Sequence, residues 1–347
     1  MKKFAIFIPT LLKGGTEKQA VLLANVLSKK GKVFFILLYP ELGLDKELLK
    51  LLEFNNIEHI LLQGAFFIKI KKLYQLFKKE KVYVLFCYLT LPNLLGSVIG
   101  KLAGVKIIFQ GIRSSFLPKK KILVEKVIGW FSNGIIINNY IGMKEFSHLG
   151  FKNMILIHNC FLNPNLPIYR ELKYTIKIIS IGRFSKEKDY LTALKAISYL
   201  KQSFRNFKYS IVGYGFLIKE IRDIIDELLL SDNVEILENP NNIDLLLRDA
   251  DIFLLSSLYE GTSNSIMEAM NATLPIVTTN VGDNIILVEN EKSGFLTNVG
   301  DFKAIANALL KLSINYDLRI RMGKRSNEIL REKFSIEKFK ESYFKLI

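Results

Sequence analysis

The sequence predicts an α/β protein made of two doubly wound domains with a cleft between them. Its 347 residues exceed the size of one typical domain, and half of them are hydrophobic, so two cores can form. Apolar runs of strand length alternate with helical patterns twice along the chain, and an irregular stretch from His158 to Lys173 separates the two series. This alternation is typical of parallel sheets with helices on both faces, which bind ligands outside the carboxyl ends of their strands.

The first series contains seven predicted strands. They are Lys3–Ile8, Lys32–Tyr39, Ile57–Leu61, Val82–Phe86, Val105–Phe109, Gly134–Ile137 and Met154–Ile157. The first apolar run mimics a signal peptide, but Pro9 interrupts it, which favours a strand. The uncharged stretch Val82–Gly100 has 19 residues, enough to span a membrane. Pro92 lies inside it, which favours a strand, a turn at Pro92 and a helix from Asn93.

The second series contains five predicted strands and is followed by a helical tail. The strands are Ile176–Ile181, Tyr209–Val212, Val234–Leu237, Asp251–Leu255 and Pro275–Thr278. The tail begins near Phe334 with apolar residues at helical spacing. We therefore expect an N-terminal domain over residues 1–165, a C-terminal domain over residues 166–327 and a final helical segment over residues 328–347.

The residues with the clearest chemistry lie between a strand and a helix of the second domain. Glu260 follows the strand Asp251–Leu255 in a loop of small polar residues, and Glu268 is expected in the first turn of the next helix. Such a loop offers backbone N–H groups to an anion, while carboxylates accept hydrogen bonds from hydroxyls. A sugar nucleotide carries both kinds of group. For Glu268, a capping box that starts at Ser265 is an equally good interpretation, whereas Glu260 has no evident structural role.

This stretch resembles the signature of glycosyltransferase family 4, the retaining, group 1 transferases of the GT-B fold. In that family two glutamates stand eight residues apart, with Gly after the first and Ala-Met after the second, as at Glu260 and Glu268. Other matching segments are Gly14-Gly-Thr-Glu17, Ile181-Gly-Arg183-Phe-Ser-Lys-Glu-Lys188, Ile211-Val-Gly213-Tyr-Gly215 and Leu274-Pro275-Ile-Val277. The resemblance covers nearly the whole chain. It implies two Rossmann-like domains facing across a cleft, with a C-terminal helix that packs back on the N-terminal domain.

The resemblance also implies roles for individual residues of the donor site. Glu260 is expected to contact hydroxyls of the donor sugar, and Glu268 the ribose. Thr262, Ser263 and Asn264 are expected to give backbone contacts to the phosphate and the sugar.

Two cations and two glycines complete the implied donor site. Arg183 and Lys188 are expected to stabilise the departing nucleoside diphosphate without a metal ion, because Arg offers a planar fork and Lys a point charge. Gly14 and Gly15 let the backbone of the N-terminal domain approach the diphosphate. Many members have a histidine near the transferred sugar. The corresponding segment here has none and contains Arg113, a candidate on the acceptor side unless it only forms an ion pair at the surface.

Positive charge is concentrated in the first half of the chain. Residues 1–165 contain 24 basic and 9 acidic residues, a net charge of +15, whereas residues 166–347 contain 25 and 24, a net charge of +1. Such asymmetry favours an anionic partner. Segments 66–81 and 118–131 combine lysines and aromatic residues at helical spacing, which is typical of helices on anionic membranes, although a helix that only covers a sheet is the alternative.

The first of these basic segments defines the predicted membrane-facing side chains. Phe67, Ile70, Leu73, Leu76 and Phe77 recur at helical spacing as its apolar side. The lysines expected to face the membrane are Lys71, Lys72, Lys78 and Lys79.

Several other classes of site find little support. The chain has no P-loop, no dinucleotide fingerprint and no nucleic-acid-binding motif, so no nucleic acid partner is expected. Asp249-Ala-Asp251 matches a metal-binding pattern of a different fold, but it straddles a helix end and a strand start. Cys87 and Cys160 stand in apolar or amide surroundings, which argues against a disulfide. We expect neither a metal ion nor a cofactor.

The sequence thus predicts a cytoplasmic hexosyltransferase that is peripheral on the inner face of the cytoplasmic membrane. It would move a sugar from a UDP- or GDP-sugar to a glycan or lipid-linked acceptor during capsule, lipopolysaccharide or glycolipid synthesis. The alternatives are a nucleotide-sugar epimerase of the same fold and a non-catalytic module that binds sugar nucleotides or membranes.

Overall fold

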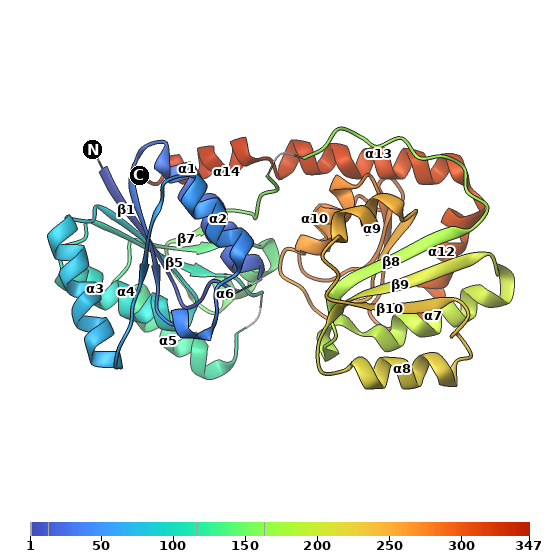
Figure 1. Ribbon diagram of the computed structural model, residues 1–347, viewed down its shortest axis with the longest axis horizontal. Helices are drawn as coiled ribbons and strands as arrows, with labels where there is room; N and C mark the ends of the chain where they lie inside the picture. The colour runs from blue at the N-terminus through green and yellow to red at the C-terminus, as the bar shows by residue number, and fades with distance from the viewer. Residues whose placement is uncertain (1, 13, 116, 163) are drawn as a thin grey trace. The chain divides into compact units, whose positions relative to one another are not determined.

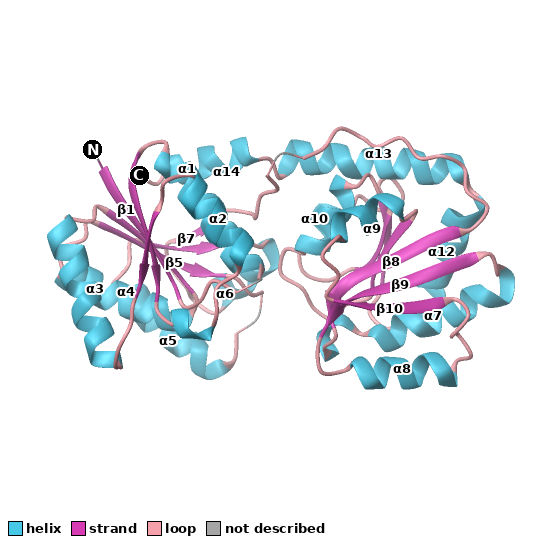
Figure 2. Ribbon diagram, in the orientation of Figure 1, coloured by secondary structure: helices cyan, strands magenta, loops and turns pink. Residues whose placement is uncertain are grey.

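The computed structural model describes residues 2–12, 14–115, 117–162 and 164–347 and divides the chain into two compact units (Figure 1). One unit comprises Met1–Leu162 with Ile336–Ile347, and the other comprises Asn163–Ser335. Residues 328–335, which the sequence assigned to the final segment, group with the second unit. Each unit contains a parallel sheet flanked by helices (Figure 2).

The N-terminal unit contains a seven-stranded sheet in the order β3-β2-β1-β4-β5-β6-β7. Neighbouring strands pair in parallel throughout. The strands are β1 (Lys2–Ile8), β2 (Gly31–Leu37), β3 (Glu58–Leu61), β4 (Val84–Tyr88), β5 (Ile107–Ile112), β6 (Gly134–Ile137) and β7 (Met154–Leu156). All seven predicted strands are confirmed. The strand order reverses between β1 and β4, which places a topological switch point at their carboxyl ends.

Helices cover both faces of this sheet. They are α1 (Gly15–Ser28), α2 (Lys46–Phe54), α3 (Phe66–Glu80), α4 (Thr90–Leu102), α5 (Lys119–Gly129) and α6 (Tyr140–His148), with a short 3-10 helix at Pro40–Leu42. Apolar residues of α1 and α2 pack with Phe4, Ile6 and Ile8, whereas those of α3 and α4 pack with Ala5 and Phe7. Successive residues of β1 therefore serve two different cores, because side chains alternate along a strand.

The C-terminal helix α14 (Ile336–Phe344) returns to the N-terminal unit, as predicted. Phe339 and Tyr343 are buried in the same core as α1 and α2. The rings of Phe86 and Tyr343 lie 5.5 Å apart, edge to face. Aromatic packing against β4 therefore fixes the end of the chain to this sheet.

The uncharged stretch from Val82 forms β4 and then α4, which confirms a strand followed by a helix. The helix begins at Thr90, earlier than predicted. Pro92 does not interrupt it, because Pro92 lies in the first turn, where its missing N–H group breaks no hydrogen bond of the helix. Within the described ranges, no helix is both long and apolar enough to cross a membrane. Cys87 and Cys160 are free, buried thiols, which confirms that they form no disulfide.

The C-terminal unit contains a six-stranded sheet in the order β10-β9-β8-β11-β12-β13. Its strands are β8 (Ile176–Arg183), β9 (Phe207–Tyr214), β10 (Val234–Glu238), β11 (Ile252–Leu255), β12 (Ile276–Thr279) and β13 (Gly294–Thr297). The five predicted strands are confirmed, and the short β13 was missed. Its helical elements are Lys186–Lys188 (3-10), α7 (Tyr190–Ser203), α8 (Ile218–Glu227), α9 (Ile243–Asp249), α10 (Asn264–Asn271), α11 (Asn284–Leu287), α12 (Phe302–Ile314) and α13 (Tyr316–Lys333).

Candidate active site

The C-terminal sheet has its own switch point between β8 and β11. These two strands are neighbours, with β9 and β10 on one side and β12 and β13 on the other. Ligands of doubly wound sheets bind at such a reversal, outside the carboxyl ends of the strands. The segment that leaves β8 contains Lys188, and the segment that leaves β11 contains Glu260. Topology alone thus brings two of the predicted site residues to one edge.

Lys188 and Glu260 form an ion pair across this switch point. The distance from Lys188 Nζ to Glu260 Oε1 is 2.5 Å, and the side chains are only 13% and 12% exposed. The Ser257 hydroxyl donates a hydrogen bond to the same carboxylate oxygen at 2.7 Å. The expectation that Glu260 has no structural role is therefore wrong, because its carboxylate ties together the loops after β8 and β11.

Backbone contacts hold these two loops in register. The Ser256 hydroxyl donates to the carbonyl oxygens of Lys188 and Asp189 at 3.0 and 2.9 Å. The Leu258 N–H donates to the Glu187 carbonyl at 2.8 Å. The Lys188 side chain therefore extends from a backbone that is fixed on both sides, which orients its ammonium toward Glu260.

Arg183 ends β8 and lies closer to solvent than Lys188. Its side chain is 64% exposed, and Nη2 lies 2.9 Å from Glu187 Oε1. Burial by itself would raise the pKa of Glu187. Hydrogen bonds from Ser185 and the backbone, together with the charges of Arg183 and Lys188, outweigh the effect of burial and hold the pKa below its ordinary value. Exposed ion pairs of this kind contribute about 0–1 kcal/mol, so an incoming phosphate can replace Glu187 at little cost.

The N-terminus of α10 contributes a third positive element. Ser263 is the N-cap, and its hydroxyl accepts a hydrogen bond from the Ile266 N–H at 3.4 Å. A capping box starting at Ser265 is therefore wrong. Glu268 is the fifth residue of α10, half-buried in the second turn rather than the first. The N–H groups before and within the first turn give this end of the helix partial positive charge.

The loop after β12 supports the Glu260 loop, which the sequence did not reveal. The Thr262 hydroxyl donates to Asp283 Oδ2 at 2.9 Å, and the Asp283 N–H donates to the Gly261 carbonyl at 3.1 Å. Gly282 has a φ of +54°, and a Cβ there would lie 2.3 Å from the Glu260 carbonyl oxygen. Only glycine fits this close approach. A Gly-Asp pair a few residues after a predicted strand is the signal that could have identified this loop.

Gly14 and Gly15 lie at the corresponding switch point of the N-terminal sheet. They follow β1 and open α1, with Gly14 as the N-cap. The carboxylate of Glu17 folds back beside Gly14. It lies so close that a Cβ on Gly14 would come within 2.4 Å of Glu17 Oε2. Burial raises the pKa of Glu17, although its own backbone and the Thr10 hydroxyl donate hydrogen bonds to it. The sequence had assigned no role to this acid.

Arg113 is half-buried in the N-terminal unit, where it contacts aromatic and amide groups, so the alternative of a surface ion pair is not supported and the acceptor-side role stays a prediction. Its guanidinium lies 4.5 Å from the centroid of the Tyr88 ring. Nη2 donates to the Tyr343 hydroxyl at 3.3 Å, and Nη1 donates to Asn159 Oδ1 at 3.5 Å. Arg113 thus fastens α14 to the carboxyl end of β5.

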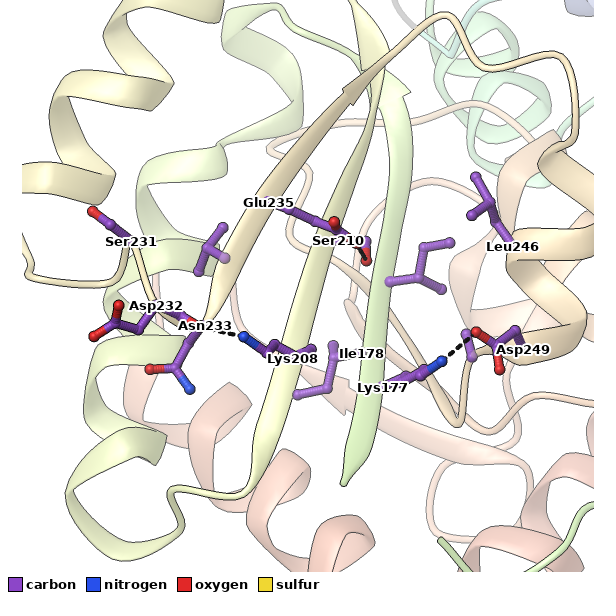
Figure 3. Close-up of a pocket in the computed structure, with 13 residues that line it drawn as sticks. Lys177, Ile178, Lys208, Ser210, Ser231, Asp232, Asn233, Glu235, Leu246 and Asp249 are labelled. Atoms are coloured by element: carbon purple, nitrogen blue, oxygen red, sulfur yellow. Dashed lines mark hydrogen bonds and ion pairs between the residues drawn. The ribbon is translucent and has the colours of Figure 1, made fainter. Parts of the chain in front are cut away.

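A cavity of about 350 Å³ lies at the opposite, amino end of the C-terminal strands (Figure 3). Lys177 contacts Asp249 at 2.5 Å, and Lys208 donates to the Asp232 carbonyl at 2.6 Å. Because Asp249 is ion-paired, its motif with Asp251 serves the structure at this end. Across the described part of the chain, no group of three His, Cys, Asp or Glu residues is arranged to hold a metal ion. This cavity is separate from the switch-point residues.

The structure places the predicted membrane-facing lysines on the outer side of α3. Lys71, Lys72, Lys78 and Lys79 are exposed. A shallow groove of about 670 Å³ runs between α3 and β3, and its lining residues include Lys72, Lys78 and Lys79 beside Ile60, Leu61 and Leu76. Phe67 was expected on the apolar side but is 83% exposed, while Lys69 is only 4% exposed and bonds Glu41 at 2.8 Å. The helix therefore presents both lysines and aromatic surface to solvent.

Residues 168–329 match the family model described as "Glycosyl transferases group 1". An Escherichia coli UDP-Gal:alpha-D-GlcNAc-diphosphoundecaprenol alpha-1,3-galactosyltransferase is 26% identical over 304 residues, which cover 79% of this chain and 78% of the relative. An uncharacterized glycosyltransferase of Haemophilus influenzae is 26% identical over an alignment of 364 residues, which covers 99% of both chains. The structure of Anabaena HepE in complex with UDP aligns with a TM-score of 0.83 over 99% of each chain. The two sequences are 17% identical, so this similarity is one of fold.

These findings confirm the GT-B fold and the family resemblance that the motifs indicated. The group 1 glycosyltransferase match lies in the C-terminal unit, and the relatives that align along most of the chain are glycosyltransferases.

Proposed function

We propose that the chain transfers a sugar from a UDP-sugar, with retention of configuration and without a metal ion, to a glycan or lipid-linked acceptor of cell-surface polysaccharide or glycolipid synthesis. The observation that carries the proposal is the Lys188–Glu260 ion pair at the β8–β11 switch point, with Arg183 on the same edge. This edge holds cations for a diphosphate and a carboxylate for sugar hydroxyls, as a sugar nucleotide requires.

The proposed diphosphate site combines Arg183, Lys188 and the N-terminus of α10. The departing nucleoside diphosphate gains negative charge, and preorganised positive groups stabilise that charge most where water is excluded. Lys188 is already oriented and shielded, whereas Arg183 exchanges a weak surface contact for phosphate oxygens. We assign backbone contacts with the phosphate and sugar to Thr262, Ser263 and Asn264, whereas the assignment of Gly14 and Gly15 to the diphosphate stays a prediction.

Glu260 is proposed to bind the donor sugar while it holds Lys188. Its carboxylate accepts hydrogen bonds from Lys188 and Ser257, and the hydroxyls of a sugar are donors of the same kind. Glu268 is proposed to accept from the ribose, because its side chain is half-buried one turn inside α10. No cofactor other than the sugar nucleotide is required in this scheme.

The acceptor and the location of the enzyme are inferred from the relatives and the charge distribution. The E. coli relative is named for a diphosphoundecaprenol-linked sugar. The exposed lysines of α3 fit an anionic surface, at about 1 kcal/mol for each basic residue near it. We therefore place the enzyme as a peripheral protein on the inner face of the cytoplasmic membrane, facing a lipid-linked acceptor.

Thermal unfolding with UDP, GDP, ADP and uridine tests the donor site. UDP at 100 times its Kd stabilises the native state by about 2.7 kcal/mol. At about 2–4 °C per kcal/mol for a unit of this size, the melting point should rise by roughly 5–10 °C. Uridine lacks the diphosphate and should shift it little. Absence of a shift with every nucleoside diphosphate would contradict the proposal, while binding without transfer to any acceptor would favour an epimerase or a non-catalytic module.

A further inference from the structure

The outward side of α5 carries an apolar stripe. Leu123, Val127 and Trp130 stand at positions i, i+4 and i+7 and are 67%, 42% and 83% exposed. Residues with this spacing share one face of a helix. The opposite face carries Glu125 and Ile128, which are each 1% exposed. Helix α5 therefore covers the sheet with one side and presents large apolar side chains to solvent with the other.

The charges around this stripe are positive. Lys119, Lys120 and Lys121 at the start of α5 are exposed. Glu125 is the only acidic residue of the helix, and its buried carboxylate accepts a hydrogen bond from Asn93 Nδ2 at 3.1 Å. The negative charge of α5 is thus directed inward, and the solvent-facing side combines lysines with apolar residues.

The neighbouring helix carries exposed side chains of the same kinds at its end. Helix α4 packs beside α5 (Figure 1). Leu102, its last residue, is 72% exposed, and Lys101 next to it is exposed as well. Both helices therefore end with large exposed side chains, Leu102 on α4 and Trp130 just beyond α5.

We propose that the outer face of α5 docks on an anionic lipid bilayer, with Leu123, Val127 and Trp130 inserted at the interface and the lysines at the headgroups. The proposal rests on the peripheral membrane location proposed above and adds an apolar anchor distinct from the lysines of α3. A lipid surface fits better than a protein groove, because exposed lysines accompany the stripe and Trp is enriched at the boundary between headgroups and acyl chains.

The single Trp of the chain makes this contact directly measurable. Trp130 is the fluorophore, and its emission should shift to shorter wavelength when wild-type protein is added to vesicles of phosphatidylglycerol and phosphatidylcholine. Brominated acyl chains in the same vesicles should quench it. Vesicles of phosphatidylcholine alone should produce little change, because the lysines then lack a partner.

A matched pair of variants tests the anchor independently of the fluorophore. Leu123→Gln with Val127→Gln should weaken co-sedimentation with anionic vesicles by roughly 10–100-fold, since it removes apolar area that would enter the interface. Leu245→Gln on α9 is the control, because Leu245 is 63% exposed, close to the 67% of Leu123, but belongs to the other unit. It should co-sediment like the wild type.

The outcomes separate this proposal from the membrane location itself. If the wild type binds anionic vesicles but Trp130 emission stays unchanged, or the Leu123 and Val127 variant binds equally well, the α5 anchor is refuted and the charge-driven location stands. If nothing binds, both are refuted. A blue shift that appears without vesicles as protein concentration rises would assign the stripe to a second copy of the chain and overturn the lipid proposal.

Discussion

Replacing Glu260 by Gln tests the link between the ion pair and catalysis. The substitution keeps the side-chain volume and removes one charge from a pair whose members are 13% and 12% exposed. Lys188 then keeps an amide oxygen as an acceptor but loses its counter-charge. We expect both lower stability and lower turnover, because the same carboxylate joins two loops and is proposed to bind the donor sugar.

The expected loss of stability follows from the burial of the pair. Removing one partner of a fully buried ion pair costs about 3–5 kcal/mol. Lys188 retains some exposure and a hydrogen-bond acceptor, so about 1–3 kcal/mol is expected here. That corresponds to a fall of roughly 2–12 °C in the melting point of a unit of this size. Turnover should fall by about 10²-fold or more, equal to at least ~2.7 kcal/mol of transition-state stabilisation.

Calorimetry and steady-state kinetics on purified protein separate these two effects. Glu289→Gln is the control, since Glu289 forms an ion pair with Arg325 at 3.0 Å in the same unit, away from the switch-point loops. It should lower the melting point and leave kcat unchanged. Wild-type turnover in Glu260→Gln would refute the assignment of Glu260 to the reaction, and an unchanged melting point would refute the structural role of the pair.

Further predictions address the cations, the metal, the membrane and pH. Arg183→Ala with Lys188→Ala should weaken UDP binding by about 10²-fold in calorimetric titration, because two charge-assisted contacts are lost; unchanged affinity would place the diphosphate elsewhere. EDTA should leave turnover intact, whereas a loss restored by magnesium or manganese would mean that a metal neutralises the diphosphate. Four Lys→Gln changes on α3 should reduce vesicle co-sedimentation by roughly 10²–10³-fold while activity on a soluble acceptor persists; equal pelleting would remove α3 from the membrane contact. The changed residues are Lys71, Lys72, Lys78 and Lys79. Hydrogen bonding and charge from Arg325 lower the pKa of Glu289 below its ordinary 4.5. The contribution of this ion pair to the free energy of unfolding is therefore complete above pH 4.5 and disappears as the pH falls through the lowered pKa. The melting-point difference between wild type and Glu289→Gln should therefore vanish in acid, and a constant difference would contradict this linkage.

Much of the fold could be predicted because burial leaves a periodic pattern along the chain. All twelve predicted strands form, and most of them are apolar runs buried between helices. Strand β13 was missed because Gly294–Thr297 is short and its two central residues are only half-buried. The positions of Lys188 and Glu260 at strand ends also follow from sequence, since residues after parallel strands meet at one edge.

The contacts of these side chains could not be predicted in the same way. Lys188 and Glu260 are 72 positions apart, and nothing in either local sequence specifies a 2.5 Å ion pair. Asp283 supports Thr262 from a different loop, and Arg113 reaches Tyr343 across 230 positions. Such pairs depend on the distances between elements after packing, and local periodicity contains no information about those distances.

Local patterns therefore established the class of fold, the order of the strands along the chain and the edge where the donor site is proposed. The tertiary structure determined which groups surround each charged side chain. Glu260 acquired a structural partner, Arg113 was hydrogen-bonded to α14, and the apolar side of α5 faced solvent. The physical reason is that hydrophobic burial is encoded by spacing along the sequence, whereas an ion pair or an exposed stripe is defined by what lies opposite it in three dimensions.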